Sequence, residues 1–448
     1  MYARDRGLPP GPAAPAIVQS VRLLRAPYRF LDACAARFGD MFTLNLIGFG
    51  RFVLVSDPEA VRRVFVAGPD VLVAGKARAM LEPIFGQRSI MVLDGPEHSR
   101  QRRFLMPHLH RDSLPLGQAA AIEAARREIR SWPRGVTFPL YPRLESIATD
   151  VIIERFLGLD GHARGAEVKG LLLDFLRAAH AFPVFHLPSL VGRLDVGPWR
   201  RFRRLRRKLD GVLYEEMAAR APGARDAPGR DLFTLFAGAQ EDSGRTAGVA
   251  ETRDVVVSVI VAGHETVAIA LAWALELILS HPDVEGELRA EIGRVTGGEG
   301  VRPEHLEGMT FLDAVIMESM RLRPINPIIP RLVTVPMELG GRVIPAGVHV
   351  AANSHGAHRR AASFPDPAAF RPQRFLHGRP DPFAWIPFGG GARKCIGMAF
   401  AQNEMKAVLA TVLSECAPRL VPARTRRETS VGDMAAPSGG VRCRLPAV

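Results

Sequence analysis

The chain has 448 residues, of which 47% are hydrophobic and 23% are charged. This balance excludes an intrinsically disordered or collagen-like protein, and a chain of this length buries enough apolar surface to enclose a cofactor. The net charge of +13 comes mainly from arginines spread over every segment, which indicates a basic soluble protein without a nucleic-acid partner.

In chain order, the predicted elements indicate one mainly α-helical domain with a small β portion, spanning residues 1–448. Residues 1–27 are proline-rich and predict an extended N-terminal arm. β-like runs at 41–46 and 51–55 flank a glycine-containing turn and predict a hairpin. Helical periodicity then covers 118–131, 144–156, 166–179, 200–219, 255–279, a helix that begins at Pro282, and 313–322. Short β-like runs follow at 331–335, 342–344 and 348–352, before a last helix over 396–414, and residues 221–229 predict an exposed loop.

The segment 255–279 is the most apolar part of the chain. Gly263, His264 and Glu265 interrupt it near its centre, and a carboxylate inside a bilayer is rare and costly. The first forty residues hold neither an 18-residue apolar run nor the apolar core of a signal peptide. We therefore expect a buried helix in a cytoplasmic protein that has no transmembrane anchor.

One of the four cysteines stands in an unusual context. Cys34, Cys395, Cys416 and Cys443 show none of the short spacings of zinc or iron–sulfur sites, and nothing like a disulfide framework. Cys395 ends a glycine-rich loop just before a predicted helix. Glycines let backbone N–H groups approach a sulfur closely, and the N-terminus of a helix favours negative charge. Cys395 is therefore the candidate metal ligand.

The spacing around Cys395, Phe-x-x-Gly-x-Arg-x-Cys-x-Gly, resembles the cysteine-ligand loop of the cytochrome P-450 family. Among its members, the chain is most similar to bacterial ones that resemble the microsomal classes. The resemblance implies the P-450 fold, with a long central helix over the haem, and heme b (iron protoporphyrin IX) as cofactor. It makes Cys395 the iron ligand and places Phe388, Arg393 and Gly397 against the haem, with Arg393 positioned to meet a propionate.

Two further segments resemble the part of the family that supports this loop. Glu318 and Arg321 lie three residues apart on one face of a predicted helix. Residues 372–375, Pro-Gln-Arg-Phe, resemble the family's motif just before the cysteine loop. The resemblance implies that Glu318, Arg321 and Arg374 form a buried ion cluster with an architectural role.

Other cationic residues match positions that bind haem propionates in the family. His98 and Arg102 lie in a segment that resembles the family's propionate-binding helix, and Arg331 matches a further such position. We therefore expect all three to be cofactor-binding residues. The other histidines of interest are expected to be structural: His264, His355 and His358.

The centre of the apolar helix carries an acid beside an alcohol. Thr266 can bond the carbonyl of Ala262, four residues earlier, and open the helix locally. An acid and an alcohol in a helix that faces a haem suit proton delivery to bound dioxygen. The order Ala-Gly-His-Glu-Thr matches the family, so that Glu265 is expected to relay protons and Thr266 to position dioxygen and a water molecule.

The resemblance implies a monooxygenase that hydroxylates or epoxidises a lipophilic small molecule such as a fatty acid, a terpenoid or a polyketide. We expect the substrate to lie against an apolar wall. The residues expected in this wall are Val261, Ala262, Ile325, Ile328 and Ile329, with 80–85 and 436–439 as further walls.

The electrons would come from separate proteins, because the chain is too short to add a flavin or ferredoxin module. We expect a ferredoxin, its NAD(P)H-dependent reductase and a monomeric enzyme. Arg100, Arg103, Lys394 and Lys406 would form a basic docking face for the acidic ferredoxin. Two alternatives stay open: a haem protein that senses or carries without turnover, and a peroxide-driven or isomerising relative. Glu265 and Thr266 favour the enzyme that uses dioxygen.

Residues 199–208 form the densest basic run, with seven arginines or lysines in ten residues. Trp199, Phe202 and Leu205 recur at helical spacing, which predicts an amphipathic helix with a cationic face. Either this face is merely solvated, or it attracts anionic lipophilic substrates or an anionic membrane surface.

Overall fold

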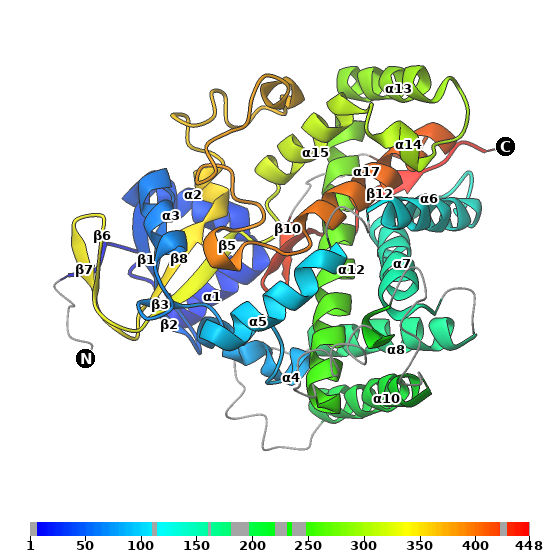
Figure 1. The fold of residues 1–448 in the computed structure, drawn as a ribbon. Coiled ribbons are helices and arrows are strands. Elements are labelled where there is room, and N and C mark those ends of the chain that lie inside the picture. The colour runs from blue at the N-terminus through cyan, green and yellow to red at the C-terminus, as the bar shows by residue number, and fades with distance from the viewer. Residues whose placement is uncertain are drawn as a thin grey trace.

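The computed structural model describes residues 7–109, 114–159, 163–180, 197–219, 231–234, 248–421 and 428–447. Figure 1 shows a β-rich region on the side of the N-terminus and a larger helical region, through which the long helix α12 (Val249–Ser280) runs. The mainly α-helical class with a small β portion is thereby confirmed. The predicted loop at 221–229 lies outside the described residues.

A five-stranded sheet with the strand order β1-β2-β8-β5-β3 organises the β-rich region. β1 (Met41–Leu46) and β2 (Gly50–Val55) form the predicted antiparallel hairpin. β2 pairs in parallel with β8 (His349–Asn353), and β8 pairs antiparallel with β5 (Ile328–Val333). β3 (Leu72–Val73) adds the last strand. The sheet thus joins the N-terminal hairpin to β5, whose Ile329 lines the same cavity as the cysteine loop.

The predicted extended arm at residues 1–27 is wrong beyond residue 15. No proline occurs between Pro15 and residue 27, so this part of the chain can form the helix α1 (Ala16–Arg25). A second helix, α2 (Pro27–Phe38), follows it. Gln19 of α1 is buried and accepts the backbone N–H of Asn45 at 2.9 Å. This contact fastens α1 to β1.

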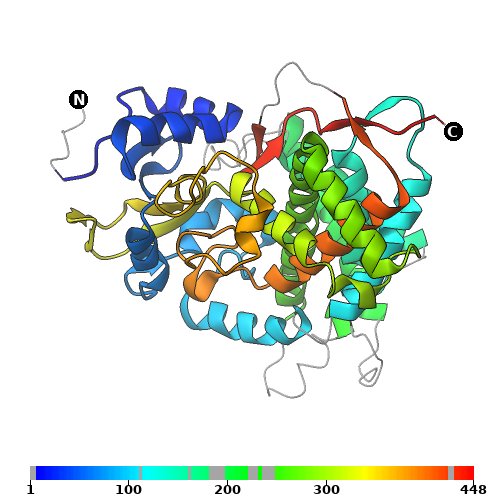
Figure 2. The same cartoon turned by 90° about the horizontal axis from the view of Figure 1, so that it is seen from above.

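The helical region packs around α12 (Figure 2). α12 contacts α7 (Tyr141–Ile152), α15 (Thr310–Leu322) and α17 (Met398–Glu415), and α17 packs on α6 (Leu114–Arg130). Among the described helices, α12 alone is long and apolar enough to cross a membrane by length and composition, yet 78% of its most apolar window is buried inside the protein. α12 is therefore the buried core helix that the sequence predicts.

The other predicted helices and strands form close to their expected places, with ends shifted by a few residues, and the structure adds elements that the sequence did not predict. The longer helices are α3 (Pro58–Val66), α5 (Gly95–Leu105), α8 (Ala163–His180), α10 (Gly197–Ala219) and α13 (Pro282–Thr296). The short helices and turns are η1 (Lys76–Leu81), α4 (Glu82–Phe85), η2 (Met106–Leu109), η4 (Ile153–Leu157), α14 (Pro303–Leu306), α16 (Ser354–Ala357), η6 (Pro372–Phe375) and η7 (Gly391–Arg393). In the small sheets, β12 (Arg442–Arg444) pairs with both β4 (Thr137–Pro139) and β9 (Arg419–Leu420), β6 (Met337–Leu339) pairs with β7 (Arg342–Ile344), and β10 (Glu428–Val431) pairs with β11 (Met434–Pro437).

Buried charges join α15 to the segment that precedes the cysteine loop. Arg321 donates from Nε to Glu318 Oε2 at 2.6 Å and from Nη2 to Oε1 at 2.9 Å, and both side chains are fully buried. Arg374 donates from Nε to Glu318 Oε1 at 3.1 Å. Arg321 also donates to the carbonyls of His358 and Pro367 at 2.8 Å. The structure thus places the three residues of the expected ion cluster in direct contact.

Candidate active site

An internal cavity of about 290 Å³ is lined both by α12 and by the loop that carries Cys395. Thr266 and Cys395 both face it, so the structure brings the expected catalytic alcohol and the expected metal ligand to one space. Most of the wall is apolar, and its members include Ile152, Phe156, Val259, Val267, Ile325 and Ile329.

Glycines and backbone hydrogen bonds shape the cysteine loop. Gly389 and Gly391 adopt left-handed φ angles of 66° and 63°. A Cβ atom on Gly391 would lie 1.9 Å from the Phe65 carbonyl oxygen, so only glycine fits there. The Cys395 N–H donates to the Phe388 carbonyl at 2.9 Å and closes the loop.

The groups around the Cys395 sulfur favour its thiolate form once a metal ion is bound. Burial raises its pKa, whereas the Gly397 backbone N–H and the cations of Arg102 and Lys394 act in the opposite direction. Gly397 is the N-cap residue of α17, so the positive end of that helix adjoins the sulfur. A metal ion that binds the sulfur displaces the proton outright. The loop therefore suits a thiolate ligand.

Five basic side chains, here called the cationic cluster, lie together at this cavity: Arg78, His98, Arg102, Arg331 and Arg393. Four of them line the cavity. Arg331 is not among the lining residues; it is buried beside them, close enough to Arg78 and Arg393 to interact electrostatically. Sequence reasoning missed Arg78, because a single arginine between alanines in a short turn carries no motif and no periodic signal.

The electrostatics of the cationic cluster are those of an anion-binding site. Burial and the charges of Arg78 and Arg393 lower the pKa of Arg331 to about 9. Burial likewise lowers the pKa of Arg393 to about 10, although Asp94 pairs with it. Arg78 and Arg331 have no carboxylate partner among the described residues. Burial and the neighbouring cations lower the pKa of His98 to about 4, so its ring is neutral at pH 7.

These surroundings fit a haem. Arg78 and Arg331, which have no carboxylate ion pair among the described residues, match the two propionates, and a cysteine facing the cavity matches the iron. Arg102 also donates to the Lys394 carbonyl at 2.6 Å, which ties α5 to the cysteine loop.

The acid and the alcohol of α12 face different surroundings. Thr266 donates from Oγ1 to the Ala262 carbonyl at 2.6 Å and lines the cavity. Glu265 is buried but does not line the cavity; its Oε1 lies 3.4 Å from His180 Nδ1. Burial, with the nearby Glu145 carboxylate, raises the pKa of Glu265 to about 8. Of these two side chains, Thr266 therefore faces the cavity and Glu265 does not.

The structure does not show the predicted local opening of the helix at Thr266. α12 continues as an α-helix through this point. The Ala262 carbonyl accepts the threonine hydroxyl without losing its place in the helix, because a carbonyl oxygen has two lone pairs.

The structure places three of the five residues expected in the substrate wall at the cavity. Ala262, Ile325 and Ile329 line the cavity, whereas Val261 and Ile328 do not. Val261 is one residue from Ala262 on a helix and so points into the neighbouring core. Ile328 and Ile329 are successive residues of β5, whose side chains point to opposite faces, and Ile328 packs on the cluster under the hairpin. Neither 80–85 nor 436–439 contributes to the lining.

The expected basic docking face is reduced to two residues. Arg103 and Lys394 are exposed. Lys406 is buried and donates to Asp313 Oδ2 at 2.7 Å, so it is wrong as a docking residue. Arg100 forms an ion pair with the buried carboxylate of Glu251, so its charge is already neutralised within the protein.

The basic run 199–208 lies in α10, which is the predicted amphipathic helix. Phe202, Leu205 and Leu209 are buried on its inner side. Arg204 and Arg207 are exposed, as are Arg200, Arg201 and Lys208.

The site defines a class, namely proteins that hold haem through a cysteine thiolate. Comparison with known proteins narrows the class. The cytochrome P450 family model matches residues 8–437, and the chain belongs to this family. The protein is accordingly a haem monooxygenase, an oxidoreductase that incorporates one oxygen atom of O2 into its substrate.

Relatives and solved structures agree with this assignment. "Putative cytochrome P450 135B1" of Mycobacterium tuberculosis is 35% identical over 408 residues, which are 91% of this chain and 84% of that protein. "Putative cytochrome P450 138" of the same species is 33% identical over 437 residues, 97% and 95% of the two chains. The structure of retinoic acid-bound cyanobacterial CYP120A1 has a TM-score of 0.84 at 23% identity and covers 99% of this chain and 100% of that one. The cytochrome P450DA heme domain has a TM-score of 0.85 at 21% identity, with 98% of each chain covered. At these identities the two structures show the shared fold.

Proposed function

We propose that this monooxygenase hydroxylates or epoxidises a lipophilic small molecule, namely a fatty acid, a terpenoid or a polyketide. The apolar wall beside Thr266 carries this proposal, because apolar walls select lipophilic ligands. Its members there include Val259, Ala262, Val267 and Ile325. CYP120A1, which shares the fold, is described as bound to retinoic acid, a lipophilic molecule.

The cofactor in this proposal is heme b, held by Cys395 through the iron and by the cationic cluster through the propionates. When bound, the haem supplies the metal at which dioxygen is activated, with the thiolate pushing electron density toward the O–O bond. Phe388 and Gly397 line the same cavity and would pack against the ring.

The proton supply falls to Glu265 and Thr266. The Thr266 hydroxyl donates its own proton to Ala262, so its oxygen is available to accept a hydrogen bond from a water molecule in the cavity. Glu265, with its raised pKa, carries a proton at pH 7. Because its carboxyl faces His180, delivery to the cavity requires a rotation of the Glu265 side chain or an intervening water molecule.

The electron donor in this proposal is a ferredoxin, itself reduced by an NAD(P)H-dependent reductase in the cytoplasm. Arg103 and Lys394 are exposed where α5 meets the cysteine loop. Cations at this face would attract an acidic ferredoxin, and their effect should weaken at high salt.

The substrate class is tested by titrating the haem-loaded protein with fatty acids, terpenoids, polyketides and polar compounds of matching size. We expect the Soret band to move with lipophilic compounds alone. Equal movement with sugars or nucleosides of the same size would show that the substrate class is wrong.

A further inference from the structure

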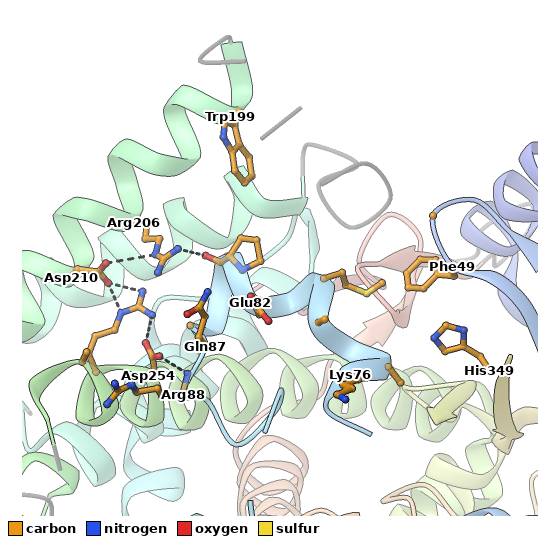
Figure 3. A pocket seen from close by; sticks show the side chains of 18 of the residues that line it. Phe49, Lys76, Glu82, Gln87, Arg88, Trp199, Arg206, Asp210, Asp254 and His349 are labelled. Atoms are coloured by element: carbon orange, nitrogen blue, oxygen red, sulfur yellow. Dashed lines mark hydrogen bonds and ion pairs between the residues drawn. The ribbon is translucent and has the colours of Figure 1, made fainter. Parts of the chain in front are cut away.

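One segment of the chain, residues 76–91, borders two separate spaces. Lys76, Met80 and Arg88 line a surface groove of about 850 Å³ beneath α10 (Figure 3). Arg78 and Met91, from the same segment, line the haem cavity. The segment is therefore a wall that the groove and the cavity share, and its position sets the dimensions of both.

Two neighbouring charged residues of α12 hold the end of this wall. Arg253 donates from Nη1 to the Phe85 carbonyl at 3.3 Å. Asp254 accepts the backbone N–H of Arg88 at 2.9 Å, as Figure 3 shows. Arg253 also donates to Asp254 Oδ1 at 3.0 Å, so each residue orients the other. Backbone groups of the wall are thus bonded to side chains of the core helix.

Two further contacts tighten the same junction. The hydroxyls of Ser89 and Ser258 lie 2.6 Å apart and are buried. Gly86 lies against Asp254 with so little space that a Cβ atom would fall 2.0 Å from Oδ1. The close fit of Gly86 against Asp254 makes the position of the wall depend on where Arg253 holds Asp254.

Arg253 also connects the wall to α10. Arg253 donates from Nε to Asp210 Oδ1 of α10 at 2.6 Å, and its Nη2 forms an ion pair with the same oxygen at 2.6 Å. Arg206, one turn earlier in α10, donates to the Pro83 carbonyl at 2.9 Å and lies 3.7 Å from Asp210 Oδ2 (Figure 3). Arg206, Asp210, Arg253 and Asp254, here called the α10–α12 ion network, thereby span α10, α12 and the wall.

Because Arg253 is buried, its charge needs every partner in this network. Only 2% of the residue is exposed, and two carboxylates balance its charge. Loss of one partner from a buried ion pair leaves the other charge uncompensated, which is far more harmful than loss of a surface pair. A substitution at Asp210 should therefore shift Arg253 and so weaken its hydrogen bond to the Phe85 carbonyl of the wall.

We propose that Arg253 is a positioning residue that fixes the end of this wall, residues 85–91, and makes the wall respond to the position of α10. A bulky ligand that passes from the groove to the cavity has to displace this wall, so the α10–α12 ion network sets how readily bulky ligands reach the haem. The proposal rests on the proposed function in taking this cavity as the substrate site.

The mechanical link is tested by amide hydrogen exchange of the haem-loaded protein. Arg253→Met and the milder Asp210→Asn should each raise exchange in the 85–92 peptide about tenfold or more, as expected when a hydrogen bond to a charged group is lost. Arg204→Gln, an exposed cation on the same helix, is the matched control and should change nothing there. Unchanged exchange in either network variant that still gives the normal ferrous–CO spectrum would overturn the proposal.

Access to the haem is tested with two iron-binding azoles, imidazole and the much larger clotrimazole. Asp210→Asn should speed clotrimazole association by the same factor as the exchange and leave imidazole association unchanged. Equal acceleration of both azoles, or of neither, would show that the wall does not control access. Neither measurement requires turnover, so the lipophilic substrate class can fail while this proposal holds, and the reverse.

Discussion

Replacement of Glu318 by glutamine should destabilise the protein strongly, because it removes the shared carboxylate of the ion cluster. The fully buried Glu318 accepts bonds from Arg321 at 2.6 and 2.9 Å, from Arg374 at 3.1 Å and from the Arg371 backbone N–H at 2.8 Å. Without the carboxylate, no negative charge faces the buried Arg321 guanidinium, which keeps only backbone carbonyls and one glutamine amide oxygen as acceptors. Breaking a buried pair costs about 3–5 kcal/mol, against a typical total stability of about 5–15 kcal/mol. We therefore expect a low yield of haem-loaded protein and a much lower midpoint in urea unfolding.

The matched control is Glu299→Gln, at a surface pair in which Glu299 is 66% exposed and bonded to Arg302 at 2.6 Å. Exposed pairs contribute little, so its unfolding midpoint should stay close to that of the parent. Arg374→Ala should fall between the two variants, because 14% of the Arg374 side chain is exposed. If Glu318→Gln unfolds at the same urea concentration as Glu299→Gln, the reasoning about the cluster is refuted.

Three further variants test the chemistry and the substrate approach. Thr266→Ala should retain haem but release more hydrogen peroxide per NAD(P)H consumed, and equal coupling in variant and parent would remove its proposed role. Burial raises the pKa of Glu265 to about 8, so the carboxyl holds a proton at pH 7 and loses it as the pH rises through 8. Parent turnover should fall across that range and Glu265→Gln should not follow it; an identical fall in both would assign the titration elsewhere. The spectral Kd of a long-chain fatty acid should rise with salt, and less so in Arg204→Gln/Arg207→Gln; insensitivity to both changes would mean that the cationic face of α10 is merely solvated. Arg206 is unsuited to this test, because it bonds the Pro83 carbonyl.

The sequence predicts best where the chemistry is local. The cysteine loop is a short run in which the glycines, the arginine and the cysteine are fixed relative to one another by the backbone, so spacing alone implies its form. α12 is equally predictable, because a long apolar helical pattern has few alternatives to burial. The hairpin of β1 and β2 follows from its turn residues for the same local reason.

The direction of single side chains is what the sequence could not supply. Ile328 and Ile329 have nearly the same chemistry, and only the register of β5 decides which one faces the cavity. Glu265 is adjacent to Thr266 in sequence, yet the helix turns its carboxyl toward His180. Lys406 resembles a surface lysine until α17 packs on α15 and buries it against Asp313.

The N-terminal segment shows a second limit. Prolines dominate its composition, but none lies between Pro15 and Pro27, and composition averaged over residues 1–27 conceals that boundary. Arg78 illustrates a third limit, since its importance arises only when η1 brings it beside Arg331 and Arg393. Residue type was uninformative there until the tertiary neighbours were known.

The ferrous–CO spectrum of Cys395→Ser tests the central claim, a haem held by the Cys395 thiolate, most directly. Cys416→Ser is the matched control, because Cys416 caps the end of α17, bonds the Val412 carbonyl and is not among the cavity-lining residues. We predict that Cys395→Ser loses the strongly red-shifted Soret band that a thiolate ligand produces, while Cys416→Ser keeps it. A red-shifted band that survives in Cys395→Ser would contradict the assignment of the iron ligand and, with it, the account of the site.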